Sequence, residues 1–191
     1  MALALKNPAY EQRRYTYTDY CKWEGPERWE LIDGVPFLMA APSVLHQNVL
    51  TSLLLQLGTF LRGKKCKVFP APFDVRLNAH AFDNTVVQPD ILVVCDKSKL
   101  NKAGLVGAPD MAIEIISPSS VTHDTVKKHA LYLKSGVKEF WIVDPETQTV
   151  VTHILSGNTY KRTVYTSLDK VPVYVLKGLV VDLGEVFEEL F

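Results

Sequence analysis

Two carboxylates interrupt apolar runs that are otherwise typical of buried strands. Asp90 lies in the run 85–96 (TVVQPDILVVCD), and Glu114 lies in the run Met111–Ile116. A carboxylate in such surroundings costs several kcal/mol unless it is paired or binds a metal ion. If the two strands are neighbours, both groups can reach one point, where a divalent cation would relieve their repulsion. Oxygen ligands favour Mg²⁺ or Mn²⁺. The alternative is two separate structural carboxylates, each hydrogen-bonded or ion-paired.

Two lysines follow the Glu114 strand. Lys127 and Lys128 lie early in a helix that we predict over 124–134. One of them could lean back over the strand ends, where it would assist a water molecule or stabilise charge on a phosphate during hydrolysis. The alternative is a surface helix with two solvated lysines. The residues of this helix that we expect to face the core are Val126, Ala130 and Leu133.

The elements that must position these residues alternate along the chain. The pair Asp33-Gly34 predicts a hairpin within 29–40, because both residues accept the left-handed backbone of a tight turn. An amphipathic helix is expected to begin after Ser43 and to end at Gly63. Buried strands are expected within 67–77, 85–96, 111–116 and 139–143. Strands with two apolar faces beside amphipathic helices predict an α/β fold. We expect its centre to be a mixed sheet of the α+β kind, flanked by helices.

The C-terminal part reads as mostly β structure. A pair of strands is expected at 150–155 and 159–165, a short strand at 173–176 and a helix at 184–190. With 191 residues, 47% of them hydrophobic, the chain is long enough for one sizeable core. We therefore expect a single domain over 1–191, with an N-terminal extension (1–28) and a β-rich part (146–191) packed on the core.

The charges sum to zero, with 21 Lys and Arg against 21 Asp and Glu. This balance argues against a protein that coats nucleic acid by bulk electrostatics. The middle of the chain (61–140) is nevertheless basic, with 12 cationic against 8 acidic side chains. Its densest cluster is Arg62, Lys64, Lys65 and Lys67. A solvated helix end followed by a turn is the alternative to a binding surface for this cluster.

The three cysteines are widely spaced and form no CxxC pair. This pattern predicts neither a disulfide framework nor a thiolate zinc site, and Cys95 is expected to be a small core residue. Lys6 and Pro8 interrupt the apolar N-terminus too early for a signal peptide. A reducing, cytoplasmic location is therefore expected.

Seven segments resemble one family in order and spacing. From about Tyr15 to Phe187, the sequence is similar to the Uma family of restriction endonucleases, within the PD-(D/E)XK nuclease superfamily. The segments are WELIDGV (29–35), PSVLHQ (42–47), VFPAPFDVRL (68–77), VVQPDILVVCD (86–96), GAPDMAIEIISPSS (107–120), DTVKKHALY (124–132) and GVKEFWIVDP (136–145).

The resemblance implies a restriction-endonuclease-like core with a Mg²⁺ (or Mn²⁺) site. Asp90 and Glu114 match the acidic residues of the motif, and the backbone carbonyl of Ile115 would complete the metal ligands. The motif lysine would fall at Ile116, so the sequence departs from the superfamily pattern here. Lys128 matches the helical lysine that takes this role in the Uma family.

One further site residue follows from the same resemblance, and the others follow from their positions in the sequence. Glu30 matches another family acid that would orient a water on the metal ion, and an ordinary strand-end carboxylate is the alternative. Gln88, His46 and Lys127 are expected to line the site. For Gln88 the alternative is a satisfied polar edge residue, and for His46 it is a backbone contact at the helix start. Basic residues expected to meet the DNA backbone are Arg62, Lys64 and Lys65.

Two functions remain open from the sequence. The first is a Mg²⁺-dependent DNA endonuclease that hydrolyses phosphodiester bonds with a metal-activated water and acts as a homodimer on both strands. The second is a catalytically inactive nuclease-like module that binds DNA or a partner protein. Ile116 at the usual lysine position and the zero net charge favour the second function.

Overall fold

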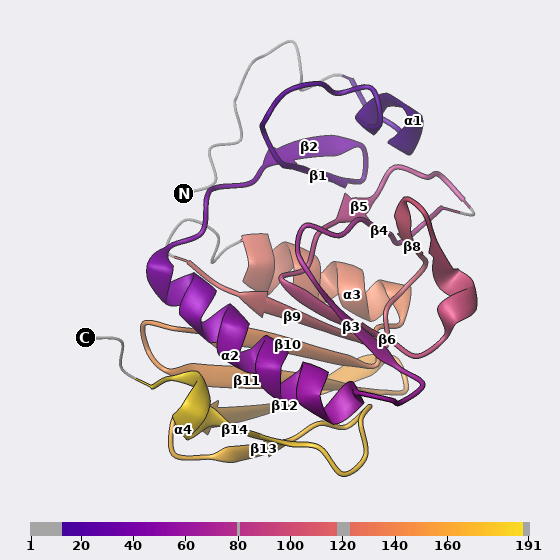
Figure 1. The fold of residues 1–191 in the computed structure, drawn as a ribbon. Helices are drawn as coiled ribbons and strands as arrows, with labels where there is room; N and C mark the ends of the chain where they lie inside the picture. Colours follow the sequence, from indigo (N-terminus) through magenta and orange to yellow (C-terminus); the bar gives the residue numbers. More distant parts are fainter. Residues whose placement is uncertain (1–12, 80, 118–122, 189–191) are drawn as a thin grey trace.

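The structure has two six-stranded sheets, and the one with the longer strands, called the larger sheet, forms the centre of the molecule (Figure 1). The computed structural model describes residues 13–79, 81–117 and 123–188. Neighbouring strands in this sheet are antiparallel except for the parallel pair β9 and β10. In spatial order the strands are β12 (Thr159–Thr166), β11 (Thr149–Ser156), β10 (Glu139–Asp144), β9 (Met111–Ile115), β6 (Ile91–Val94) and β3 (Lys67–Pro70).

The smaller strands form a second sheet and a separate pair. In spatial order the second sheet contains β2 (Val35–Leu38), β1 (Trp29–Ile32), β5 (Val86–Val87), β4 (Val75–Arg76), β8 (Gly104–Val106) and β7 (Leu100–Asn101). The separate pair is β13 (Lys170–Pro172) with β14 (Val180–Asp182).

Helices cover both faces of the larger sheet (Figure 1). Helix α2 packs with the odd-numbered residues of β9 and with α4, and Tyr132 of α3 packs with Ala112 on the opposite face. The helices are α1 (Tyr17–Tyr20), α2 (Val44–Leu61), α3 (His129–Ser135) and α4 (Leu183–Val186), with a 3₁₀ turn η1 (Lys97–Lys99) and a π-helical turn η2 (His123–Lys128). The predicted mixed α+β fold is confirmed.

The first hairpin and the long helix follow local sequence signals. Asp33 and Gly34 both have positive φ, at 49° and 77°, as the predicted tight turn requires. Ser43 caps α2, since its Oγ accepts a hydrogen bond from the His46 N–H at 3.2 Å. The buried face of the helix carries residues spaced four apart, namely Val49, Leu53, Leu57 and Leu61.

Two predicted strands are each divided between the two sheets. The segment 67–77 contains β3 of the larger sheet and β4 of the second, and 85–96 contains β5 of the second and β6 of the larger. Pro89 lacks an N–H for a sheet, and the chain changes sheets at Gln88-Pro89-Asp90. This break at Pro89 places Asp90 directly before β6, where the two sheets meet.

The segment from β13 to α4 packs on the α2 side of the larger sheet, whereas β11 and β12 of the predicted β-rich part are strands of that sheet. Val171, Val181 and Phe187 belong to the same core cluster as the buried face of α2. The predicted strand at 173–176 is instead a turn between β13 and β14, in which the Val173 N–H donates to the Leu179 carbonyl at 3.0 Å. The predicted helix over 184–190 is shorter, and 189–191 lie outside the described residues.

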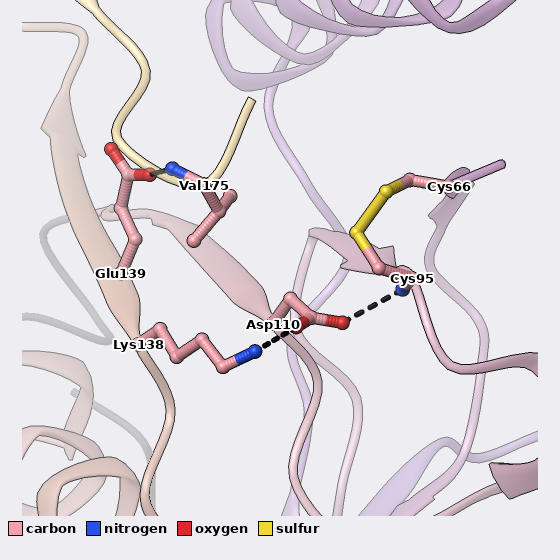
Figure 2. Close-up of a disulfide and its surroundings, with 6 residues drawn as sticks. All are labelled: Cys66, Cys95, Asp110, Lys138, Glu139 and Val175. Atoms are coloured by element: carbon pink, nitrogen blue, oxygen red, sulfur yellow. Dashed lines mark hydrogen bonds and ion pairs between the residues drawn. A yellow bond between two sulfur atoms is a disulfide. The ribbon is translucent and has the colours of Figure 1, made fainter. Parts of the chain in front are cut away.

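Cys66 and Cys95 form a disulfide, which contradicts the expectation from their spacing (Figure 2). Strands β3 and β6 are antiparallel with Lys67 opposite Val94, so the two cysteines are the next pair in register. Nearby, Asp110 accepts from the Cys95 N–H at 2.7 Å and from the Lys138 ammonium at 2.6 Å. A reducing compartment therefore does not follow from the cysteines, and the cytoplasmic location stays a prediction.

Membrane-spanning helices are absent from the described part of the chain, where no helix has the length and apolar character to cross a bilayer.

Candidate active site

Asp90 and Glu114 come together at one end of strands β6 and β9. These strands are antiparallel with Ile91 opposite Ile113, so the two acids are the next pair in register. The Asp90 carboxylate accepts a hydrogen bond from the Ile115 N–H at 2.8 Å, which holds it beside the end of β9. Both acids line one pocket of about 140 Å³. The predicted meeting of two carboxylates on neighbouring strands is thus present in the structure.

The pocket lies between the β1–β2 hairpin, the first turns of α2 and the ends of β6 and β9. Its apolar wall includes Phe37, Met39 and Leu50. The ionisable side chains that line it are Arg28, Glu30, His46, Asp90, Glu114 and Lys128. Leaving His46 out of the count, three carboxylates face two cations, which gives a formal charge of −1.

Lys128 is buried between two of these carboxylates. Its Nζ lies 2.9 Å from Glu30 Oε1 and 2.9 Å from Glu114 Oε2, and its side chain is 2% exposed. The predicted core face of this helix was wrong, because Val126 is 63% exposed whereas Lys128 and Tyr132 are buried. A lysine can replace an apolar residue at a buried position when carboxylates satisfy its charge, and Glu30 and Glu114 do so here.

Tyr132 was not predicted from the sequence. Its hydroxyl donates to Glu114 Oε1 at 2.6 Å, and its ring is fully buried. Burial, together with the neighbouring Glu114 charge, raises the pKa of this hydroxyl well above its usual value, so it remains a donor. The signal that could have found it is its spacing, four residues after Lys128 and so on the same helix face.

Glu30 and Gln88 are connected through the backbone. The Gln88 N–H donates to Glu30 Oε1 at 2.7 Å, so Glu30 accepts from both this amide and Lys128. Gln88 itself does not line the pocket, although its side-chain oxygen accepts from the guanidinium of Arg28, which does. Arg28 was also missed from the sequence, where only its position directly before the hairpin strand distinguishes it.

The His46 side chain contacts the Asp90 carboxylate and not a backbone group. Its Nε2 lies 3.2 Å from Asp90 Oδ2. Its Nδ1 is buried and has no hydrogen-bond partner in the part of the chain that the structure describes. Lys127 is exposed and does not line the pocket, and its Nζ lies 4.2 Å from the centre of the Phe37 ring.

The basic cluster is not part of this pocket. Arg62 follows α2 and comes sixteen residues after His46, which corresponds to about 24 Å along an α-helix. Lys64 and Lys65 lie at the same end of the helix, where Lys64 Nζ contacts the Phe60 ring at 2.9 Å from its centre. The structure therefore separates these three residues from Asp90 and Glu114.

The oxygen donors of the pocket fit a hard divalent cation. Asp90 and Glu114 supply carboxylates, which suit Mg²⁺ or Mn²⁺. Within residues 13–79, 81–117 and 123–188, no three His, Cys, Asp or Glu side chains are grouped as a metal site. Two carboxylates with backbone and water oxygens match the usual pattern for Mg²⁺, which keeps several waters.

Comparison with known proteins supports a nuclease fold. A family model, Uma2, described as "Putative restriction endonuclease", matches residues 16–184. The crystal structure of "a putative nuclease belonging to DUF820" from Anabaena variabilis superposes with a TM-score of 0.74. It covers 91% of this chain and 97% of that chain at 21% identity. A protein of Synechocystis sp. described as uncharacterized is 22% identical over 135 residues, 70% of each chain. The expected restriction-endonuclease-like fold is therefore present.

Proposed function

The chain belongs to the Uma2 family, described as "Putative restriction endonuclease", and we propose that it is a Mg²⁺-dependent endonuclease that hydrolyses phosphodiester bonds of DNA. The observation that carries this proposal is the pairing of Asp90 and Glu114 in one pocket beside the buried Lys128. Buried acids and a buried cation in one pocket are costly to fold, and such groups are concentrated at functional sites.

Asp90, Glu114 and the Ile115 carbonyl would hold Mg²⁺ or Mn²⁺. A divalent ion there supplies an acidified water and neutralises charge on the phosphate. Lys128 would donate a hydrogen bond to the phosphate oxygen on which charge develops, and Glu30 fixes its position at 2.9 Å. His46 holds Asp90, and Tyr132 holds Glu114.

The proposal also includes the substrate, the oligomeric state and the cellular location. The substrate is DNA, and a homodimer would allow both strands to be cut. Arg62, Lys64 and Lys65 would contact the DNA backbone away from the reacting phosphate, and Lys127 would lie near its entrance. The chain would act as one domain in the cytoplasm.

Plasmid nicking with Mg²⁺ or Mn²⁺ tests the proposed activity. Asp90→Ala removes a carboxylate of the pocket and should reduce the rate by more than about 100-fold. Asp96→Ala is the matched control, because this exposed residue lies at the opposite end of the same strand. The proposal is wrong if the Asp90 variant nicks as fast as the wild type, or if chelation of the metal leaves nicking unchanged.

An inactive nuclease-like module is the second candidate. Ile116 at the usual lysine position and the balanced charge favour it. Metal titration separates the two functions, because an ion that binds the folded chain raises its melting temperature. An active site should show a Mn²⁺-dependent rise that Glu114→Ala abolishes, whereas an inactive module should show neither.

A further inference from the structure

Arg28 differs from the other cation of the pocket in having no acidic partner. Lys128 forms ion pairs with both Glu30 and Glu114, and its side chain is 2% exposed. Arg28 is half-buried and also lines the pocket. Its guanidinium bonds to the Gln88 side chain, and no carboxylate of the described residues forms an ion pair with it. Its positive charge is therefore available to an anion that enters the pocket.

The guanidinium of Arg28 is fixed along one edge by a polar network. Gln88 Oε1 accepts from Arg28 Nε at 3.2 Å and from Nη2 at 2.9 Å. Gln88 Nε2 donates to Asp74 Oδ1 at 2.9 Å and to the Tyr20 hydroxyl at 3.2 Å. Because a carboxylate can only accept, the amide nitrogen must face Asp74 and the amide oxygen must face Arg28. The Nη1 group has no acceptor within the described residues and keeps its donors free.

Gln88 holds two charged groups that line the pocket. Its backbone N–H holds Glu30, and its side chain holds Arg28. Gln88 is 6% exposed, and its amide is supported by Asp74 and Tyr20 from different elements. The buried amide thus holds the guanidinium in place before any ligand arrives, which lowers the entropic cost of binding.

The charge of the pocket indicates which ligand this guanidinium would bind. Three carboxylates repel an anion, and a bound divalent cation would change the formal charge of the lining from −1 to +1. A planar guanidinium with parallel N–H donors matches the oxygens of a phosphate better than an ammonium does. We propose that Arg28 binds a non-bridging oxygen of the substrate phosphodiester, and that Gln88 is the positioning residue for Arg28. This inference rests on the proposed nuclease function.

Two substrates test the inference, namely a supercoiled plasmid and the small phosphodiester bis(p-nitrophenyl) phosphate. Arg28→Ala should lower kcat/KM on both by about 10- to 100-fold, as expected for a hydrogen bond to a charged group. Arg28→Lys should recover part of the loss. Gln88→Ala keeps the backbone N–H to Glu30, so it should raise KM more than it lowers kcat. Arg162→Ala removes the same charge from exposed β12 and should leave both rates unchanged.

Binding measured without cleavage separates this inference from the proposed function. With Ca²⁺ as the divalent ion, the affinity for a short DNA duplex is followed by fluorescence anisotropy over a range of salt concentrations. Loss of one phosphate contact should reduce the slope of log K against log salt by about 0.9 in Arg28→Ala. The Mn²⁺-dependent rise in melting temperature should remain, which shows an intact fold and acidic site.

The outcomes separate the phosphate contact of Arg28 from the proposed nuclease function. If the wild type cleaves and the Arg28 and Gln88 variants match it in kcat/KM and salt slope, the inference is overturned and the nuclease function stands. If the wild type does not cleave but binds DNA through Arg28, the nuclease function fails and the phosphate contact stands. If the wild type neither cleaves nor binds DNA, both are overturned.

Discussion

Lys128 joins two carboxylates that come from different sheets. Glu30 lies in β1 of the second sheet, and Glu114 lies in β9 of the larger sheet. Each acid also accepts a second hydrogen bond, Glu30 from the Gln88 N–H and Glu114 from the Tyr132 hydroxyl. These additional bonds offset part of the cost of burying three charges. The ammonium therefore has a structural role in addition to the one proposed for it with the substrate.

Lys128→Met should destabilise the fold strongly, because it leaves two buried carboxylates without a cation. Breaking a buried ion pair costs about 3–5 kcal/mol, which corresponds to roughly 10 °C in the melting temperature of a chain of this size. Added Mn²⁺ should raise the melting temperature of the variant more than that of the wild type, since the acids lack their internal cation. Thermal unfolding with and without Mn²⁺ measures both effects.

Lys127→Met is the matched control for this experiment. Lys127 is the preceding residue and is exposed, with a ring contact to Phe37. Its loss should change the stability by less than about 1 kcal/mol. Equal melting temperatures for the Lys127 and Lys128 variants would contradict the structural role of the buried lysine.

At the scale of elements, local signals predicted more than long-range ones. The hairpin turn at Asp33-Gly34 and the buried face of α2 follow from neighbouring residues, and both were predicted. The meeting of Asp90 and Glu114 was expected from the pattern only if their two strands were neighbours, and the family resemblance implied a joint site. The local sequence pattern therefore predicts the hairpin and α2, and it identifies the two carboxylates as candidate site residues.

The inward face of η2 and α3 could not be predicted in this way. A pattern of apolar residues selects Val126 as a core residue and treats Lys128 as a surface residue. The observed burial depends on Glu30, which a hairpin far earlier in the chain supplies. The network of Arg28 and Gln88 likewise joins elements that are distant in sequence. A hydropathy pattern depends on neighbouring residues and cannot reveal charge pairs between distant segments.

The disulfide between β3 and β6 should stabilise these elements under oxidising conditions. Its cysteines are 29 residues apart, and the chain-entropy model gives about 3–4 kcal/mol for a loop of this length. Cys95→Ser should therefore lower the melting temperature by roughly 10 °C without reductant. Thermal unfolding with and without dithiothreitol measures this difference.

Cys21→Ser provides the control, since Cys21 is exposed and free. It should leave the melting temperature unchanged with or without dithiothreitol. Thiol titration of the unfolded, non-reduced chain should find one free thiol in the wild type. Three free thiols, together with a melting temperature that dithiothreitol does not alter, would contradict the disulfide.

For the whole molecule, the zero net charge conceals an uneven arrangement. The pocket concentrates acids where the two sheets meet, and Arg62, Lys64 and Lys65 lie at the opposite end of α2. A bound divalent cation would make the pocket positive without altering the remaining surface. The balance of charges therefore does not exclude DNA as a substrate, but it favours local contacts near the pocket over a broad basic surface.

His153 links the stability of the whole molecule to pH. It is buried on the face of the larger sheet that α3 covers, where its ring stacks on Phe140 at 5.4 Å and lies 4.8 Å from the His129 ring. Burial, with a smaller contribution from His129, lowers the pKa of His153 from 6.5 to about 4. Between pH 6.5 and about pH 4, His153 is therefore protonated more in the unfolded chain than in the folded chain. The free energy of unfolding falls as the pH falls through this range.

Thermal unfolding at about pH 7.5 and about pH 5 tests this linkage. The melting temperature of the wild type should be several degrees lower at the acidic pH. Burial raises the pKa of Glu139, which acts in the opposite direction, so the comparison must be made between variants. His153→Phe keeps the stacking on Phe140 and removes the titrating group, so its acid-induced loss should be smaller. A loss of the same size in both proteins would show that His153 does not carry the effect and that other groups titrate instead.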